Sequence, residues 1–374
     1  MNILYVTPYL PVSGSHGCAS KNWDDIETLS SNHRIHLVCF VAPEDKEKVR
    51  FLEAKNCEVY PFFVQSYQGL AARHQPIRDL VEKLLKSRAV DIIQCECSFM
   101  ARHLPPFGKF PSLLVEHQVY WLHFWREFKV KKTPIALFRI LQNIIAEKMG
   151  LSRFGKVVFF SQHDRRLFGF LVHDLRKTQV IPLGIDIEHY RPQEAGPEYD
   201  ACFLGNFFSY PNEDAVMYFV LKILPLIEKT RPDFSLLVIG ENSSRSLEKL
   251  VSLGCIETAG SVKDVRPYLA KARIFINPMR LGSGMRRKVL EAWAMGKPVV
   301  STTIGCEGLD ARDRENILIA DTPEGFARAI NTLLEDGALR LKVGQEARKT
   351  VEDRHDRRKI AASQEELYAQ LTRR

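Results

Sequence analysis

The stretch that decides the fold is Asn277–Thr302, which reads NPMRLGSGMRRKVLEAWAMGKPVVST. An apolar strand ends at Asn277, and a glycine-containing loop follows it. The pattern then predicts a helix from about Met285 to Met295, a helix-ending glycine at Gly296 and a strand over Pro298–Thr302. The free N–H groups and the positive dipole end at the start of such a helix predict a seat for phosphate.

Working outward in both directions, short apolar runs alternate with amphipathic stretches. Strand–helix alternation is typical of parallel sheets covered by helices. We therefore expect the α/β class, with two doubly wound Rossmann-like domains facing a cleft in which ligands bind at the carboxyl ends of the strands. The predicted strands are Asn2–Thr7, Ile35–Ala42, Val59–Phe63, Ile92–Cys95, Ser112–Glu116, Lys156–Ser161, Thr178–Ile181, Tyr199–Gly205, Ser235–Ile239, Ile256–Ala259, Ile274–Asn277, Pro298–Thr302 and Ile317–Ile319.

A change in composition marks the boundary between the two domains. The stretch Pro182–Pro197, PLGIDIEHYRPQEAGP, carries prolines and glycines and no periodic apolar pattern. We expect an N-terminal domain over residues 1–182 and a C-terminal domain over residues 183–355. The final segment, 356–374, is predicted to form a helix that crosses back onto the first domain.

Composition limits the class of protein. With 374 residues, 45% of them hydrophobic and 26% charged, the chain has the balance of a globular protein. No apolar run is long enough for a membrane-spanning helix, and the start MNILYVTPYL lacks the features of a signal peptide. We expect a cytoplasmic protein, placed at most at the inner membrane surface. The eight cysteines include no CxxC pair, which predicts buried reduced thiols and no metal site.

The formal net charge of +8 is uneven and peaks over residues 126–156. A helical pattern there has one apolar face, made of Ile135, Phe138, Leu141, Ile145 and Met149. Packing of that face on the N-terminal sheet is the favoured interpretation. The alternative is peripheral contact with an anionic membrane through the N-terminal domain. No recognition motif for nucleic acid accompanies the charge, so no nucleic-acid partner is expected.

The basic pair Arg286 and Lys288 lies where cations oppose the helix dipole, so its sequence position does not favour helix stability. Beside a diphosphate the two cations would form charge-assisted hydrogen bonds with the phosphate oxygens. Glu291 lies roughly 7–8 Å further along the helix axis, at a rise of about 1.5 Å per residue, and could accept hydrogen bonds from ribose hydroxyls. The alternative is a surface helix in which Arg287 and Glu291 form an i,i+4 ion pair.

This segment resembles the donor-binding signature of the family 4 (group 1) glycosyltransferases, retaining enzymes with the GT-B fold. It is most similar to the branch with G-x-R-x-K-x-L-E-A, here Gly284–Ala292. The resemblance extends over the second domain and more loosely over the first. Its other marks include FLGNFFSYPNEDAVMYFV at 203–220, AGSVKDVRPYLAKARIFINP at 259–278, VEHQVYW at 115–121 and VIPLGID at 180–186.

The resemblance implies that the N-terminal domain, 1–182, binds the acceptor and that the C-terminal domain, 183–355, binds the nucleotide-sugar donor, and it implies roles for individual residues. Arg286 and Lys288 would hold the donor diphosphate, Glu291 the ribose, and the backbone around Val262 the base. His117 matches a family histidine that touches the transferred sugar or the acceptor. The full set of implied site residues is Arg286, Lys288 and His117 as catalytic residues, with Gly17, Asn206, Val262, Ser283, Gly284, Met285, Leu290 and Glu291 as donor-binding residues.

The sequence also departs from the wider family. Many members have a sugar-binding glutamate where this chain has Ser283. Many have an arginine and a lysine where this chain has Asn206 and Asn212. In the branch named above, Arg286 and Lys288 take the place of those cations.

No Asp-x-Asp motif occurs, so the expected reaction is metal-independent, with the leaving diphosphate neutralised by side chains and a helix end. The resemblance implies a retaining hexosyltransferase that uses a UDP- or GDP-sugar as co-substrate and no further cofactor. The expected acceptor is a sugar, lipid-linked or natural-product hydroxyl, in polysaccharide or glycoconjugate biosynthesis. Two alternatives stay open: a nucleotide-sugar epimerase of similar architecture and a nucleotide-sugar-binding protein without turnover.

Overall fold

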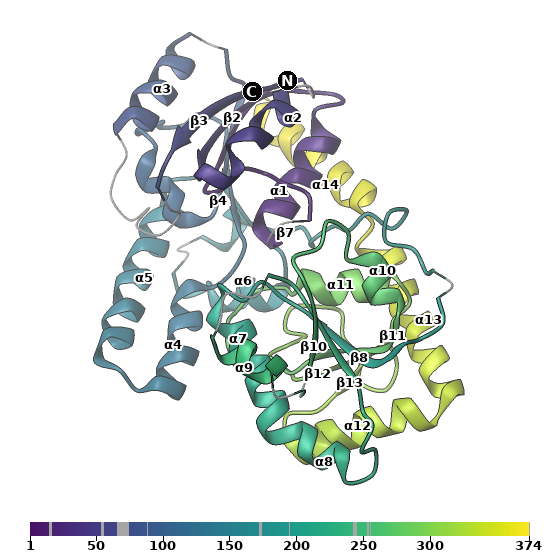
Figure 1. Cartoon of the computed structure of the whole chain (residues 1–374). Helices are drawn as coiled ribbons and strands as arrows, with labels where there is room; N and C mark the ends of the chain where they lie inside the picture. The colour runs from purple at the N-terminus through teal and green to yellow at the C-terminus, as the bar shows by residue number, and fades with distance from the viewer. Residues whose placement is uncertain are drawn as a thin grey trace. The chain divides into compact units, whose positions relative to one another are not determined.

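The computed structural model describes residues 1–373 apart from 15–16, 54–55, 66–74, 88, 172–173, 194, 242–244, 253 and 255. The chain divides into two compact units. Unit 1 comprises Met1–Phe128, Lys132–Gly184 and Arg357–Arg374, and unit 2 comprises Lys129–Lys131 and Ile185–Asp356. Figure 1 shows the chain passing from the purple strands and helices of unit 1 to the green ones of unit 2, with the yellow C-terminal helix beside α1.

Unit 1 is built on a parallel sheet with the strand order β3-β2-β1-β4-β5-β6-β7. All of its strand pairs are parallel, and its apolar side chains form a core that includes Leu4, Phe40, Leu114 and Phe159. The strands are β1 (Asn2–Thr7), β2 (Arg34–Val41), β3 (Cys57–Phe63), β4 (Ile92–Glu96), β5 (Ser112–Glu116), β6 (Lys156–Phe159) and β7 (Thr178–Val180).

Helices connect and cover this sheet. The last helix of the chain, α14, packs against α1 and β4, which joins the C-terminal segment to unit 1. The α-helices are α1 (Gly17–Leu29), α2 (Val49–Glu53), α3 (Gln75–Lys86), α4 (Tyr120–Lys131), α5 (Pro134–Ser152), α6 (Gln162–Leu167) and α14 (Arg357–Thr372). The short 3-10 helices are η1 (Pro43–Lys48), η2 (Ser98–His103) and η3 (Leu175–Lys177).

Unit 2 repeats the architecture with the parallel strand order β10-β9-β8-β11-β12-β13. Its strands are β8 (Tyr199–Leu204), β9 (Leu236–Ile239), β10 (Glu257–Gly260), β11 (Ala272–Asn277), β12 (Val299–Ser301) and β13 (Leu318–Ile319). Its helices are α7 (Tyr210–Tyr218), the π-helical turn η4 (Phe219–Ile223), α8 (Leu224–Glu228), α9 (Arg245–Ser252), α10 (Arg266–Ala270), α11 (Arg287–Ala294), α12 (Pro323–Glu335) and α13 (Gly337–Arg354).

The predicted α/β class with two doubly wound sheets is confirmed. Each predicted strand is present, with ends that shift by one or two residues. In each unit the strand order reverses beside the first strand, between β1 and β4 in unit 1 and between β8 and β11 in unit 2. Loops at such a switch point diverge and leave room for a ligand at the carboxyl ends of the strands.

The segment Tyr210–Glu228 is helical, but it does not form one regular α-helix. It is divided into α7, the π-helical turn η4 and α8. Pro225 lies in the first turn of α8 and has no N–H to donate to the preceding turn. A single wide turn is a common way for a helix to absorb such a missing bond.

The favoured interpretation of α5 was wrong, because its apolar face does not pack on the sheet. Ile135, Phe138 and Met149 are each about two-thirds exposed, at 65%, 66% and 65%. The helix instead buries a different face, which includes the small residues Ala136 and Gly150. A Cβ on Gly150 would lie 2.9 Å from the Ser98 carbonyl oxygen, so the small residues allow the helix to lie directly on η2.

The seven cysteines that the structure describes carry thiols, and all of them except Cys18 are buried; Cys255 lies outside the described residues. Among the described helices, none combines the length and the apolar character needed to cross a membrane.

Candidate functional site

The loop between β11 and α11 forms the centre of the candidate donor site in unit 2. Gly282 and Gly284 have positive φ values of 87° and 79°, a conformation that glycine adopts without strain. The loop turns back so that Arg286 Nη1 donates to the Ser283 carbonyl at 3.0 Å and Nη2 donates to the Leu281 carbonyl at 3.2 Å. A Cβ on Gly282 would lie 3.1 Å from the guanidinium, so the glycine makes room for Arg286. The loop therefore fixes the position of a cation.

Helix α11 begins at Arg287, two residues later than predicted, and Arg286 is its N-cap with an extended backbone (φ −95°, ψ 93°). The Arg286 side chain consequently belongs to the loop and not to the first helical turn. The first N–H groups of α11 and the Arg286 guanidinium thus lie at the same carboxyl-end edge of the sheet. This is the arrangement that binds phosphate in other helix N-termini.

Lys288 is held by neutral groups. Its Nζ donates to Asn212 Oδ1 at 2.7 Å and lies 4.3 Å from the centre of the Phe203 ring. Burial and the neighbouring Arg286 guanidinium lower the pKa of Lys288 to about 7, while Glu291 acts in the opposite direction. An anion placed between Arg286 and Lys288 would favour the charged ammonium.

Asn206 and Asn212, which replace the family's cations, form a hydrogen-bonded chain to Lys288. Asn212 Nδ2 donates to the Asn206 carbonyl at 2.7 Å, and Asn206 Oδ1 accepts from the Phe208 N–H at 2.9 Å. The loop after β8 can approach β9 closely because Gly240 has no side chain: a Cβ there would lie 1.8 Å from the Gly205 carbonyl oxygen. Asn206 and Lys288 are therefore brought to one edge of the unit 2 sheet.

Glu291 is buried on α11, with 8% of its surface exposed. Its Oε1 accepts from Arg287 Nε at 2.9 Å and from the Tyr190 hydroxyl at 3.2 Å. The i,i+4 pair that served as the alternative interpretation is thus present. Together with Tyr190 it orients the carboxylate.

The other residues predicted to contact the donor differ in how exposed they are. Val262 lines a surface pocket of unit 2 together with Ser261 and Tyr268. Met285 is half-buried, whereas Ser283 and Gly284 are buried in the loop. Leu290 is completely buried, so its side chain packs inside unit 2 and only its backbone could meet a donor.

Unit 1 holds a second cluster at the carboxyl ends of β4 and β5. Glu96, the last residue of β4, accepts from Lys21 Nζ at 2.8 Å and faces His117 Nε2 at 2.5 Å. Burial opposes the charge on Glu96, but Lys21 and His117 outweigh burial and lower its pKa to about 2. Burial likewise opposes the charge on His117, yet Cys18 and Glu96 raise its pKa to about 10. His117 is therefore held in one orientation by a carboxylate behind it.

Two further carboxyl groups of unit 1 are buried. Glu116 accepts from the Ser98 N–H at 2.9 Å, and Glu147 accepts from the Tyr120 N–H at 2.6 Å. Burial raises the pKa of Glu116 to about 8 and that of Glu147 to about 9. These groups are directed into the protein and contribute to packing and not to the surface near His117.

Three residues of these two clusters, Lys21, Glu96 and Tyr190, were not predicted from the sequence. A carboxylate at the end of an apolar strand, as in IIQCE, was the signal available for Glu96. Nothing local in the sequence links Tyr190 to Glu291, which is 101 residues away. Gly17, the predicted loop glycine, is the exposed first residue of α1. Residues 15–16 of that loop lie outside the described residues.

Comparison with known sequences places a family match in unit 2. Residues 198–336 match the model of the family described as glycosyl transferases group 1. The chain is 32% identical over 145 residues to the lipopolysaccharide core biosynthesis glycosyltransferase LpsE of Rhizobium meliloti (strain 1021), covering 37% of this chain and 42% of LpsE. The matches thus span less than half the length of the first curated relatives, 44% and 42%.

Comparison with solved structures covers the whole chain. Sucrose-phosphate synthase from Thermosynechococcus elongatus superposes with a TM-score of 0.78 at 17% identity, over 99% of this chain and 98% of that one. HepE from Anabaena, solved in complex with UDP and glucose, gives 0.72 at 16% identity over 98% and 99%. Identities this low show the fold alone. The protein thus has the fold of these GT-B structures, and residues 198–336 of its second unit are similar in sequence to the group 1 glycosyl transferases.

Proposed function

We propose that this protein is a glycosyltransferase that moves a hexose-type sugar from a nucleoside-diphosphate sugar to an acceptor hydroxyl, with retention of configuration and without a metal ion. Polysaccharide or lipopolysaccharide biosynthesis is the proposed setting. The observation that carries the proposal is the loop–helix unit in which Arg286 and Lys288 flank the first turn of α11.

The diphosphate, the ribose and the base of the donor are each assigned to groups of unit 2. The diphosphate is assigned to Arg286, Lys288 and the N–H groups at the start of α11. The ribose is assigned to Glu291, whose orientation is fixed by Arg287 and Tyr190. The base is assigned to the backbone around Val262. His117 of unit 1, held by Glu96, is the proposed contact to the transferred sugar or to the acceptor.

The proposed chemistry needs no enzymic nucleophile. The acceptor oxygen forms a bond to the anomeric carbon on the face from which the diphosphate leaves, as the bond from that carbon to the phosphate oxygen breaks. The departing phosphate oxygen takes the acceptor's proton. Arg286, Lys288 and the helix N–H groups stabilise the charge that develops on the diphosphate.

The comparisons support this assignment at a coarser level. The family match lies over unit 2, which also contains the residues proposed to bind the diphosphate. HepE, which shares the fold, was solved with UDP and glucose, which favours a nucleotide-sugar donor. LpsE acts in lipopolysaccharide core biosynthesis, which favours a related acceptor class.

An anionic membrane is the proposed location of the acceptor. The exposed face of α5 presents Ile135, Phe138, Leu141, Ile145 and Met149, all of them more than half exposed. Arg139 and Lys148 on the same helix and Lys132 before it are exposed as well. Apolar side chains bordered by cations complement a surface of acyl chains and anionic headgroups. The face therefore suits peripheral attachment beside a lipid-linked acceptor.

The deciding experiment measures nucleotide release from UDP- and GDP-sugars with and without a panel of sugar, lipid-linked and polysaccharide acceptors, in excess chelator. Acceptor-dependent release with an α-to-α product, seen by NMR, supports the proposal. Interconversion of the nucleotide sugar without an acceptor would instead indicate an epimerase. Binding without turnover over the whole panel would indicate a binding protein, and loss of activity in chelator that magnesium restores would contradict metal independence.

A further inference from the structure

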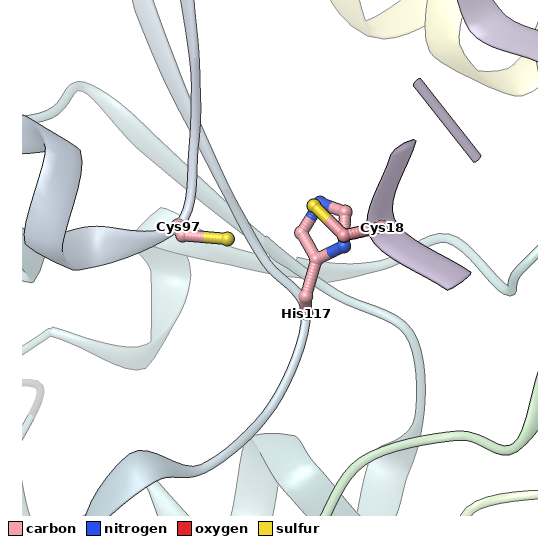
Figure 2. A group of neighbouring side chains, drawn as sticks. All are labelled: Cys18, Cys97 and His117. Atoms are coloured by element: carbon pink, nitrogen blue, oxygen red, sulfur yellow. The ribbon is translucent and has the colours of Figure 1, made fainter. Parts of the chain in front are cut away.

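Three side chains with metal-binding atoms meet at the switch point of unit 1. Cys18 is in the first turn of α1, Cys97 directly follows β4 and His117 directly follows β5. One ligand atom from each lies within 4.8 Å of the others. Figure 2 shows the Cys97 sulfur directed toward the imidazole of His117 and the Cys18 sulfur beside the same ring.

The donor set is one that borderline-soft ions prefer. Two thiolates and one imidazole bind Zn²⁺ in many proteins, with metal–sulfur distances of about 2.3 Å and metal–nitrogen distances of about 2.0–2.1 Å. Two sulfurs on a tetrahedral zinc ion lie about 3.8 Å apart by that geometry. The side chains therefore need to close by no more than about an ångström.

The group behind His117 also has the form of a metal site. The Glu96 carboxylate lies 2.5 Å from His117 Nε2 and accepts hydrogen bonds from Lys21 and Gln94 as well. With Nε2–H donating to the carboxylate, Nδ1 is the ring atom that can bind a metal once it has released its own proton. Histidine ligands of metals commonly donate their other N–H to a carboxylate, a backbone carbonyl or water. Glu96 is completely buried, which keeps this orientation fixed.

The three ligands differ in exposure, and His117 is half-buried. Cys97 is buried, while Cys18 is half-buried and follows the exposed Gly17. Cys97 has a positive φ of 69° with ψ 131°, a backbone conformation that is costly for a residue with a side chain. Its sulfur is thereby held toward the other two ligands.

We propose that Cys18, Cys97 and His117 form a three-ligand site for Zn²⁺ in unit 1, with the fourth position open to water. This proposal departs from the expectation of no metal site, which considered only the spacing of cysteines and acidic residues along the sequence. The three proposed zinc ligands all belong to unit 1. Because His117 is the proposed contact to sugar or acceptor, zinc loading should inhibit transfer, and that one consequence rests on the proposed function.

The test uses the full-length protein, reduced with a phosphine and freed of metal, and does not require activity. Zn²⁺ is titrated against a chromophoric chelator, and Co²⁺ is added as a spectroscopic probe. We expect one tightly bound zinc ion per chain and a cobalt spectrum with thiolate-to-metal charge transfer and intense tetrahedral bands. A wild-type cobalt spectrum without thiolate bands would overturn the proposal.

The variants separate ligation from folding. Cys97→Gly removes one ligand at a position whose positive φ suits glycine, so the fold should be retained, and zinc affinity should fall at least 100-fold. Glu96→Gln should lower affinity about 10- to 100-fold by weakening the support of His117. Cys202→Ala, a buried cysteine of unit 2, is the matched control and should bind zinc like the wild type. Unchanged affinity and cobalt spectrum in folded Cys97→Gly would refute the site.

Discussion

Lys288 Nζ donates a hydrogen bond of 2.7 Å to the side-chain oxygen of Asn212, so this half-buried lysine meets a neutral amide where a carboxylate would have held its charge. The pKa of Lys288 is lowered to about 7 by burial and by Arg286. Because the Asn212 amide is neutral, it does not compensate the positive charge of Lys288. The charged ammonium can therefore be stabilised by the proposed diphosphate. Asn212, a departure from the family pattern, is thus explained by the lysine that it faces.

The protein should take up a proton at Lys288 when it binds the donor at alkaline pH. Lys288 is mostly neutral in the free protein above about pH 7, and a bound diphosphate favours its charged form. UDP affinity should therefore fall as pH rises from about 7 towards 9, and calorimetry in buffers of different ionisation enthalpy should detect uptake of up to about one proton. Lys288→Met should bind UDP more weakly and show neither effect. A wild-type affinity independent of pH would contradict this role.

Arg286→Ala should lower turnover about 10²- to 10³-fold, because one charge-stabilising donor to the leaving diphosphate is lost. Steady-state rates of nucleotide release measure the effect. The matched control is Arg312→Ala, which removes a half-exposed arginine of unit 2 that pairs with Glu315. A near-normal rate for Arg286→Ala would remove the central residue from the proposed mechanism.

Glu291→Gln should weaken donor binding about 10- to 100-fold, in line with loss of a hydrogen bond to a charged group. If Glu291 contacts the ribose, a 2′-deoxy nucleotide should lose affinity in the wild type and little more in the variant. The comparison is a two-by-two cycle of protein and ligand, measured as UDP and 2′-deoxy-UDP affinities. Equal losses for the deoxy ligand in both proteins would show that Glu291 acts only through Arg287.

The buried Glu147 should make the folded protein less stable as pH rises. Its pKa is about 9 in the folded state, against 4.5 for an ordinary glutamate, so between these values the folded state holds a proton that the unfolded state has lost. Stability therefore falls with rising pH over this window, by up to about 1.4 kcal/mol per pH unit from this group. Glu147→Gln should make the free energy of unfolding, measured with urea from pH 5 to pH 8, depend less on pH. Glu366→Gln, an exposed carboxylate on α14, should leave it as in the wild type.

Sedimentation with vesicles tests the face of α5. Binding to anionic vesicles is expected at low salt and should weaken at physiological salt, because part of the attraction is screened. Leu141→Ser should reduce the bound fraction about tenfold, since burial of such a side chain contributes about 1.5–3 kcal/mol. Leu341→Ser is the control, because Leu341 of α13 is exposed to a similar degree, 63% against 59% for Leu141. No sedimentation at low salt would end the proposal.

Local sequence was sufficient for the elements and for the donor loop. Each strand could be placed because buried parallel strands are continuous apolar runs, and the loop before α11 because only glycine suits its two positive φ values. The helix boundary at Arg287 was less predictable, because it depends on the Arg286 side chain bonding back to the loop. The exposed face of α5 was mispredicted because periodicity shows that a helix has an apolar face without showing what covers it.

What the sequence alone determined, then, was the α/β alternation, the two doubly wound units and the loop–helix unit with its two cations. Only the tertiary structure brought Cys18, Cys97 and His117 within 4.8 Å and placed Glu96 and Lys21 behind them. The physical reason is the sheet order: β1, β4 and β5 are separated along the chain but are adjacent in the sheet, so the residues at their carboxyl ends meet. Likewise, Asn212 and Lys288 meet because β8 pairs with β11.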